Sequence, residues 1–424
     1  MSNLAFLFPG QGSQYIGMGK ELYKNHAIAR EVFDEANEIL GFDLKNLCFN
    51  GDLEVLTKTE NTQPAVLTAS VAAFKVFNME FGINPEYMAG HSLGEFSALA
   101  CAGAIKFQDA VKIVRHRGKF MQEAVPIGLG TMAAVSSVNK EIIEGECKKY
   151  NDNSQTVVVS NYNSPEQIVI SGHSQAVNVV GENLKKLGAR VVPLKVSAPF
   201  HSPLMQQAAE RLEAELKKYT YSHMNCKIIS NVTALPYDGH HSIVDNLVLQ
   251  IVKPVRWTES MEYLESQGVD LVIEFGPQTV LKNLMRKNVP TINAFSFDKE
   301  EDVKVLKEKL LSKAGESPDN NKDMKIKLIG RCLAIAVCTK NNNWDNEQYN
   351  KGVVEPYRRI KEMLEMLEAK AIDPNIEQMK EALKMLKSVF NTKGTSQNEQ
   401  IQRFKQIFEE TGLRSMFMDM DLPA

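Results

Sequence analysis

Residues 88–97 read MAGHSLGEFS and place Ser92 between two glycines, Gly90 and Gly94. The stretch stands where a short apolar strand is expected to turn into a helix. A Gly-x-Ser-x-Gly turn can expose a serine hydroxyl as the nucleophile of an acyl transfer or a hydrolysis. The same letters also suit an ordinary strand-to-helix turn in which the serine only caps the helix. Which of the two applies depends on what other groups the chain supplies.

A serine hydroxyl needs a base that removes its proton, and the chain has 8 histidines from which to choose. His91 adjoins Ser92, but its side chain should point away from a serine at the apex of a turn. The others, except His201, lie in polar stretches, in a turn or in a predicted helix. His201 lies in the irregular segment KVSAPFHSPLM, where the chain returns to its main sheet. It is therefore our candidate base, and the alternative is a buried loop histidine.

An acyl transfer also needs two N–H donors for the oxyanion of its tetrahedral intermediate. The residue after the serine usually supplies one of them, here the backbone of Leu93. The loop FPGQGSQ offers another, because Gly10 and Gly12 let the backbone near Gln11 approach a ligand closely. Taken alone, a glycine-rich loop after a strand is more often only a turn.

Seven motifs occur in order between residues 4 and 281: LFPGQGSQYIGMGKEL, TENTQPAV, AGHSLGEFSAL, VRHRGKFMQEA, NYNSPEQIVISG, APFHSPLM and GPQTVL. With this set the chain resembles the malonyl-CoA:acyl-carrier-protein transacylase family and the related acyltransferases of polyketide synthases. The resemblance covers about the first 310 residues. FPGQGSQ together with GHSLGE is specific, whereas Gly-x-Ser-x-Gly alone is shared with esterases and many hydrolases.

The resemblance implies a role for each residue that matches a family motif. Ser92 is then the acyl-accepting nucleophile and His201 its base, while the N–H groups of Gln11 and Leu93 form the oxyanion hole. The histidine of this family is oriented by a backbone carbonyl near the segment NLVLQIVKPVRW, in which Gln250 is the matching residue. No acidic third member is then required.

Three further residues match positions that contact the acyl group in the family. Arg117 matches the arginine that holds the free carboxylate of malonyl; a guanidinium grips a carboxylate through two hydrogen bonds and disfavours neutral acyl chains. Without the family context, Arg117 would be a solvated helix residue. Phe200 matches an aromatic of many malonyl-selective polyketide acyltransferases, where methylmalonyl-selective relatives and single-function bacterial transacylases often have serine. Gln63 either lines the pocket or caps the helix that follows it.

The implied reaction moves a malonyl group from malonyl-CoA to Ser92 and then to the phosphopantetheine thiol of an acyl carrier protein, with no metal or other resident cofactor. We expect the enzyme to serve a polyketide synthase in trans, and fatty-acid synthesis is an alternative. A proofreading acyl hydrolase of the same fold is a second alternative, which Arg117 disfavours because neutral acyl groups gain nothing from a buried charge. A catalytically inactive carrier-protein docking module is a third.

Strand and helix patterns alternate along most of the chain, which favours a parallel α/β sheet with helices on both faces. We expect an α/β-hydrolase-like core over residues 1–127 and 198–311. The order strand–helix–strand–strand–helix–strand predicts an inserted ferredoxin-like subdomain over residues 128–197. SKAGESPDNNKD is typical of a linker, which we place at 312–324. Helical apolar stripes then predict an all-helical unit over 325–424.

The role of this C-terminal unit does not follow from its sequence. Its apolar stripes contain methionines, which suit an adaptable partner surface but are more often ordinary core residues. One hypothesis is that the unit docks the enzyme to a polyketide assembly line whose modules lack their own acyltransferase.

Composition and charge exclude several other classes. With 43% hydrophobic and 24% charged residues the chain has the composition of a soluble globular protein. The net charge of -3 gives no basic footprint for nucleic acid. No run of about 18 apolar residues predicts a membrane span, and the N-terminal apolar stretch is too short for a signal peptide. The 6 cysteines are scattered, which fits a reducing cytoplasm rather than a zinc site.

Overall fold

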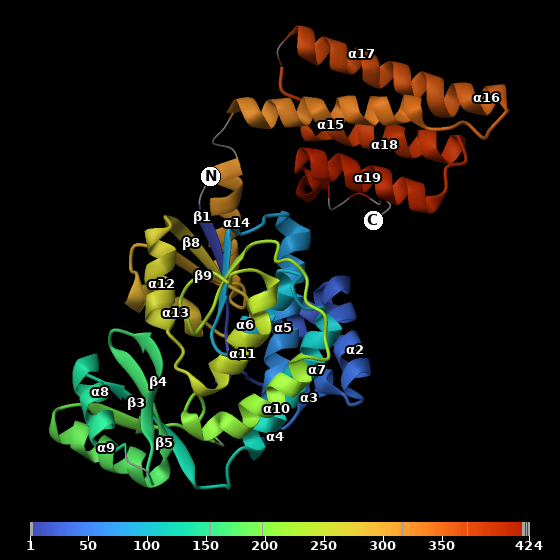
Figure 1. Cartoon of the computed structure of the whole chain (residues 1–424). Coiled ribbons are helices and arrows are strands. Elements are labelled where there is room, and N and C mark those ends of the chain that lie inside the picture. The colour runs from blue at the N-terminus through green and yellow to red at the C-terminus, as the bar shows by residue number, and fades with distance from the viewer. Residues whose placement is uncertain are drawn as a thin grey trace. The chain divides into compact units, whose positions relative to one another are not determined.

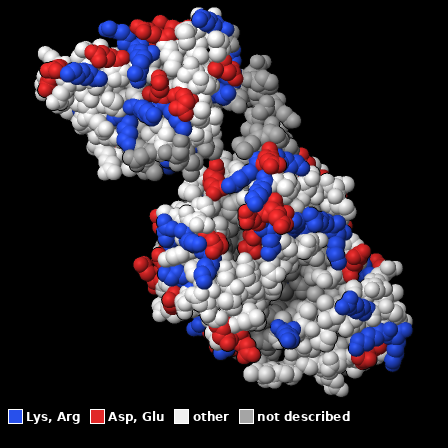
Figure 2. All heavy atoms as spheres, turned by 180° about the vertical axis from the view of Figure 1, so that it is seen from behind, with Lys and Arg blue, Asp and Glu red and all other residues white. Residues whose placement is uncertain are grey.

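The computed structural model describes residues 3–151, 154–196, 198–314, 318–370, 372–417, 420 and 422 (Figure 1). The chain divides into two compact units. One comprises Met1–Val76 and Asn84–Lys304, and the other comprises Phe77–Ile83 and Val305–Ala424. Acidic and basic side chains are intermingled on the face of each unit that Figure 2 displays, as a net charge of -3 leads one to expect. In the part of the chain that the structure describes, no helix combines the length and the apolar character needed to cross a bilayer.

A five-stranded sheet with the strand order β7-β2-β1-β8-β9 lies at the centre of the first unit, and all its pairings are parallel. Its strands are β1 (Asn3–Phe8), β2 (Tyr87–Gly90), β7 (Lys227–Ile229), β8 (Val269–Glu274) and β9 (Asn293–Ser296). β1 shows why both faces are apolar. Ala5 and Leu7 belong to the core on one face, while the rings of Phe6 and Phe8 pack against Phe74 on the other.

The α-helices within residues 3–127 and 198–314 lie around this sheet or follow it along the chain. They are α1 (Lys20–Asn25), α2 (Ala27–Leu40), α3 (Leu44–Asn50), α4 (Leu53–Thr57), α5 (Thr59–Phe81), α6 (Leu93–Cys101), α7 (Phe107–Glu123), α10 (Gln206–Leu216), α11 (Ile243–Val252), α12 (Trp257–Ser266), α13 (Val280–Asn288) and α14 (Glu300–Ala314). α10 packs against both α7 and α11, an arrangement that brings three distant segments together. α1 and α2 are separated at His26, whose backbone is extended.

The segment between α7 and α10 forms a second sheet, which is antiparallel and has the strand order β4-β5-β3-β6. Its elements follow the order β3 (Gly130–Ser136), α8 (Lys140–Lys149), β4 (Val157–Ser164), β5 (Gln167–His173), α9 (Ser174–Lys186) and β6 (Arg190–Pro193). Both helices pack on one face of this sheet around Val135, Ile170 and Val180. β4 also contacts the segment that leads into α12, because Tyr162 N–H donates to the carbonyl of Val255 at 2.9 Å.

The described residues after 317 form helices and turns only. The elements are α15 (Pro318–Cys338), α16 (Asn346–Tyr349), the π-helical turn η3 (Asn350–Val354), α17 (Glu355–Ala369), α18 (Ile376–Thr392), α19 (Gln397–Thr411) and the 3₁₀ turn η4 (Arg414–Phe417). α15 packs against α17, α18 and α19 around a core that includes Leu328, Leu386 and Phe404. A capping box at Asn375 begins α18.

The linker expected at 312–324 differs from the structure in the part that is described. α14 continues to Ala314, and α15 already begins at Pro318. A proline followed by acidic and amide residues is typical of a loop, but proline is also well tolerated in the first turn of a helix. Residues 315–317 and Ser197, at the predicted end of the insert, lie outside the described residues.

Candidate active site

Ser92 lies in the turn between β2 and α6, residues 90–94, which we call the Ser92 turn. Its φ of 51° and ψ of -105° fall outside the regions that side chains favour. Two glycines make so tight a turn possible. A Cβ on Gly90 would lie 1.9 Å from the backbone of Gly94, and a Cβ on Gly94 would lie 1.9 Å from the carbonyl oxygen of Phe8. Among the described residues the Ser92 hydroxyl caps no N–H of α6, so the helix-capping alternative does not hold.

His201 lies directly against this serine. Its Nε2 is 2.9 Å from Ser92 Oγ, and its Nδ1 is 2.7 Å from the backbone carbonyl oxygen of Gln250. A carbonyl can only accept, so Nδ1 carries the ring hydrogen and Nε2 is left to accept the serine proton. Burial, reinforced by the charge of Arg117, lowers the pKa of His201 to about 3. The imidazole is therefore neutral at neutral pH, as a general base must be.

Arg117 is buried in the same place, at 1% exposure, and is not a solvated helix residue. Its Nη2 donates to Ser92 Oγ at 3.0 Å and to Gln250 Oε1 at 2.9 Å, and its Nη1 donates to Gln63 Oε1 at 2.8 Å. Burial lowers the pKa of Arg117 to about 9, so the guanidinium stays charged at neutral pH. Its Nε is buried without a hydrogen-bond partner among the described residues.

Gln63 lies inside α5 rather than before it, so it does not cap that helix. Its side chain is buried and contacts Arg117 through Oε1 and the sulfur of Met121 through Nε2. Phe200 is also buried, at 7% exposure, and immediately precedes His201. The part of Phe200 in acyl selectivity stays a prediction.

The loop that carries Gln11 lies against the Ser92 turn. A Cβ on Gly10 would be 2.4 Å from the carbonyl oxygen of His91, so the two backbones touch. Ser13 closes the loop, because its N–H and its hydroxyl both donate to the carbonyl of Gly10, at 3.3 and 2.8 Å. Leu93 is the first residue of α6, where the geometry of a helix provides no intrahelical acceptor for its N–H. The two segments predicted to supply oxyanion donors are thus neighbours.

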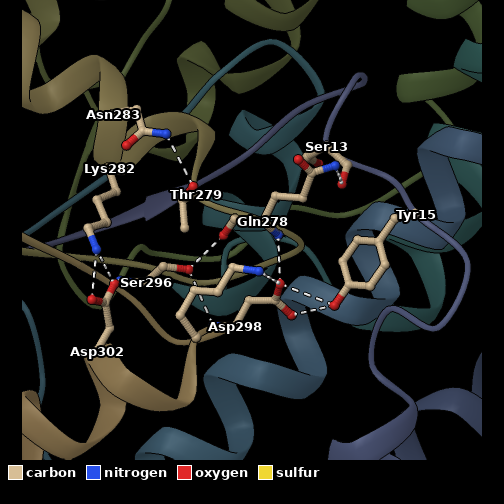
Figure 3. A network of polar contacts seen from close by, with 10 residues as sticks. Ser13, Tyr15, Gln278, Thr279, Lys282, Asn283, Ser296, Asp298 and Asp302 are labelled. Atoms are coloured by element: carbon tan, nitrogen blue, oxygen red, sulfur yellow. Dashed lines mark hydrogen bonds and ion pairs between the residues drawn. The ribbon is translucent and has the colours of Figure 1, made fainter.

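The GPQTVL motif also contacts this loop (Figure 3). Gln278 Nε2 donates to the carbonyl of Ser13 at 3.0 Å, and the Gln278 N–H donates to Asp298 at 2.9 Å. The same carboxylate accepts a hydrogen bond from the hydroxyl of Tyr15 at 2.9 Å. Gln278 has a φ of 67°, an unusual value that this closed network of polar contacts maintains. The motif and Asp298 therefore anchor the chain on the C-terminal side of Gln11.

Three buried residues that contact the site were missed by sequence reasoning: Asn231, Glu95 and Tyr237. Asn231 fastens the Ser92 turn, since its Oδ1 accepts the Ser92 N–H and its Nδ2 donates to the carbonyl of Gly90, both at 2.7 Å. A signal for it existed, because Asn231 follows the buried strand β7, and polar residues at the carboxyl ends of parallel strands often face a site.

Glu95 and Tyr237 form a second layer under the serine. Glu95 is fully buried and accepts hydrogen bonds from Gln250, Asn231 and the hydroxyl of Tyr237. Burial raises the pKa of Glu95 to about 7. His91 points away from Ser92, as expected, and its Nε2 lies 2.8 Å from Asn163 Oδ1 in β4. The insert thus reaches the immediate surroundings of the Ser92 turn.

A cavity of about 540 Å³ also lies between the insert and the core, lined by residues such as Glu144, Tyr162, Arg256 and Glu259. None of the predicted site residues lines this cavity. This cavity is therefore distinct from the buried group of Ser92, His201 and Arg117.

The sequence of this chain is similar to known protein families and to individual proteins. Residues 5–306 match the family described as the acyl transferase domain. A malonyl CoA-acyl carrier protein transacylase of Bacillus subtilis is 40% identical over 405 residues, which cover 96% of this chain and 100% of the relative. The Escherichia coli K12 protein of the same name is 46% identical over 299 residues, covering 70% of this chain and 96% of the relative. The first relative therefore extends into the C-terminal helices, which the family match does not reach.

Solved structures give the same result. The malonyl CoA-acyl carrier protein transacylase of Coxiella burnetii superposes with a TM-score of 0.71 at 41% identity, covering 73% of this chain and 98% of that one. A malonyl-transacylase solved in complex with a type II polyketide synthase acyl-carrier protein superposes with a TM-score of 0.69 at 41% identity, covering 71% of this chain and 97% of that one.

Proposed function

This chain belongs to the acyl transferase family, with the malonyl CoA-acyl carrier protein transacylases among its relatives, and on that premise we propose that it transfers a malonyl group from malonyl-CoA to an acyl carrier protein. One observation carries the proposal. The hydroxyl of Ser92 lies 2.9 Å from a neutral imidazole and 3.0 Å from a buried guanidinium. The imidazole supplies a base for acyl transfer, and the guanidinium suits an acyl group with a free carboxylate.

The first step loads the enzyme. His201 Nε2 removes the proton of Ser92 Oγ as that oxygen attacks the thioester carbonyl carbon, and the N–H groups of Gln11 and Leu93 hold the oxyanion that forms. The carbon–sulfur bond then breaks, and the imidazolium returns its proton to the departing CoA thiolate. The carbonyl of Gln250 accepts the Nδ1 hydrogen throughout, at 2.7 Å, so the ring keeps its orientation without an acidic partner.

The second step reverses these roles. The phosphopantetheine thiol of the carrier protein gives its proton to His201 and attacks the malonyl ester on Ser92, whose oxygen takes the proton back as it leaves. The reaction needs no resident cofactor, because phosphopantetheine arrives on the partner. Exclusion of water matters in both steps, since hydrolysis of the ester would lose the acyl group.

Arg117 supports malonyl as the acyl group. Its buried Nε lacks a partner among the described residues, and a buried donor of this kind is costly unless a ligand satisfies it. A carboxylate that bound Nε and replaced Ser92 Oγ as an acceptor of Nη2 would satisfy the donor and make a direct ion pair in one bidentate contact. A neutral acyl chain would do neither. This argument disfavours the proofreading hydrolase, and the complete set of reacting groups disfavours an inactive docking module.

An intact-mass experiment tests the proposal. The protein is mixed briefly with malonyl-CoA or with acetyl-CoA, beside a Ser92→Ala control, and then with a holo acyl carrier protein. We expect a malonyl adduct that requires Ser92 and passes to the carrier protein. An enzyme that loads acetyl or longer acyl groups and quickly loses them to water is the hydrolase instead.

We further propose that the carrier protein belongs to a polyketide synthase that the enzyme serves in trans. Phe200 supports this assignment, as does the similarity to a transacylase solved with a polyketide synthase carrier protein. Transfer to carrier proteins of fatty-acid and polyketide origin, compared side by side, separates the two pathways. Removal of the chain after about residue 315 tests whether the C-terminal helices select among carriers while malonyl loading of Ser92 is unchanged.

We also propose a subdomain for the insert, an independent C-terminal unit and a cytoplasmic location. The strand order β4-β5-β3-β6 with both helices on one face supports a ferredoxin-like subdomain for the insert over 128–197. A separate core, around Leu386 and Phe404, supports an independent helical unit over 325–424. The scattered cysteines support a cytoplasmic location.

A further inference from the structure

Glu95 is a carboxyl group inside the catalytic centre to which the steps above assign no role. It lies on α6 one turn after Ser92, and its side chain is 0% exposed. Gln250 Nε2 and the Asn231 N–H donate to its Oε2 at 2.5 and 3.2 Å, and the hydroxyl of Tyr237 donates to its Oε1. All three contacts come from donors, an arrangement that fits an ionised carboxylate.

The side-chain amide of Gln250 connects this carboxylate to Arg117. Gln250 Oε1 accepts from Arg117 Nη2 at 2.9 Å, while Gln250 Nε2 donates to Glu95 and, at 3.0 Å, to the carbonyl of Ser92. One amide thus stands between a buried cation and a buried anion. A buried charge is costly without a counter-charge, and Glu95 supplies that counter-charge to Arg117 across a single side chain.

Few groups near Glu95 can change their charge around neutral pH. Arg117 approaches it from α7 and Tyr237 from the segment after β7, while His201 lies beyond Ser92. Burial raises the pKa of Tyr237 well above its ordinary value, and it lowers the pKa of His201 to about 3. Glu95 has a pKa raised to about 7, so it is the group of this cluster that titrates near neutrality.

We propose that Glu95 is a positioning residue that gives up its charge to the substrate: when a carboxylate-bearing acyl group pairs with Arg117, Glu95 takes up one proton from solvent. The inference rests on the proposed function, because it requires a malonyl group on Ser92. Two carboxylates beside one guanidinium would leave an excess negative charge in a buried site, and protonation of Glu95 removes it. The protonated Oε1 of Glu95 can donate to the hydroxyl oxygen of Tyr237, while Oε2 still accepts from Gln250 and Asn231.

The proton uptake fixes the sign of a pH dependence. Above the pKa of Glu95 in the unloaded enzyme, malonyl loading must bind a proton, so its equilibrium constant falls by up to about tenfold per pH unit. Below that pKa Glu95 is protonated in both states, and loading no longer depends on it. A neutral acetyl group leaves Glu95 paired with Arg117, so acetyl loading lacks this dependence.

The test compares wild type, Glu95→Gln and Tyr237→Phe. Each is equilibrated with malonyl-CoA and CoA at pH values between about 6 and 8.5, and the malonylated fraction is read by intact mass. Wild type should lose malonyl as the pH rises, while Glu95→Gln should not, because glutamine does not titrate. At each pH, the loading equilibrium constant of wild type is divided by that of Glu95→Gln. This ratio removes the contribution of the released CoA thiol, which ionises equally in both experiments. Tyr237→Phe should move the wild-type transition to higher pH, because it removes a hydrogen bond that lowers the pKa of Glu95.

Each other outcome has a definite meaning. Equal pH slopes in wild type and Glu95→Gln, or an equal slope for acetyl-CoA, would overturn the inference. If Glu95→Gln fails to fold, an unshifted pH transition in Tyr237→Phe is enough by itself to overturn the inference. A wild-type enzyme that forms no malonyl adduct on Ser92 would instead refute the proposed function, so the two failures are distinguishable.

Discussion

The Nδ1 atom of His201 lies 2.7 Å from the backbone carbonyl oxygen of Gln250. In many serine enzymes a carboxylate occupies this place, holds the ring and stabilises the imidazolium. Here a neutral carbonyl holds the same tautomer without adding a negative charge. The formal charges of the centre are then those of Arg117 and Glu95, which the side chain of the same Gln250 connects. Orientation of the base and recognition of the acyl carboxylate therefore depend on one residue.

Replacement of Arg117 should change which acyl group the enzyme accepts. Arg117→Ala removes the guanidinium that would hold malonyl, and loss of a charge-assisted contact costs about 1.5–3 kcal/mol, or roughly ten- to a hundredfold. We expect kcat/KM for malonyl-CoA to fall by that factor relative to acetyl-CoA. Arg117→Lys should also be impaired, because an ammonium cannot make the bidentate contact. An unchanged malonyl-to-acetyl ratio would contradict this role.

Gln278 should influence the rate although it lies outside the reacting group. Gln278→Ala removes the hydrogen bond to the carbonyl of Ser13 and loosens the loop of Gln11. Because a displaced oxyanion donor weakens only transition-state binding, kcat should fall by roughly tenfold, less than for loss of a donor, with little change in KM. Asn283→Ala is the matched control, since it removes an exposed hydrogen bond to Thr279 in the adjoining helix. Equal effects of the two variants on transfer kinetics would contradict an anchoring role.

The loading rate should not fall when the pH passes through the ordinary pKa of histidine. Burial lowers the pKa of His201 to about 3, so the imidazole stays neutral and basic far below pH 6.5. Single-turnover loading, followed by rapid quench between pH 7.5 and pH 5, should therefore show no acid limb from His201. A limb with a midpoint near 6.5 that persists in Glu95→Gln would show that this histidine is solvated, because that variant removes the carboxyl that titrates near 7. Acetyl-CoA is the suitable substrate, because it leaves the proposed protonation of Glu95 out of the comparison.

Gly94 should not tolerate a side chain. In Gly94→Ala the new Cβ would lie 1.9 Å from the carbonyl oxygen of Phe8, so the Ser92 turn and β1 must move apart. We expect a loss of stability of about 1–3 kcal/mol and a larger loss of malonyl loading. Gly145→Ala, in α8, is the control, because its Cβ would meet nothing within 4 Å. That variant should raise helix stability by about 0.5–1 kcal/mol. Urea denaturation and intact-mass loading measure both effects.

Local patterns in the sequence determined much of this molecule. The family resemblance drawn from seven motifs is confirmed by the match of residues 5–306 and by relatives with 40% identity or more. The Ser92 turn was also predictable, because glycines at 90 and 94 act on their immediate neighbours. The alternation of buried strands and amphipathic helices had the same local origin. The described parts of the stretch 312–324 are helical, because proline and polar residues suit the start of a helix as well as a loop.

Only the tertiary structure decided how the buried centre is connected. Gln250 contacts His201, Arg117 and Glu95 at once, although these residues come from separate helices and a loop far apart in the chain. Such contacts depend on how α6, α7 and α11 pack, and no local pattern encodes that packing. A backbone carbonyl acceptor has no residue type by which a sequence could reveal it. Glu95 looks like any acidic residue in the first turn of a helix, and only its complete burial makes its charge important.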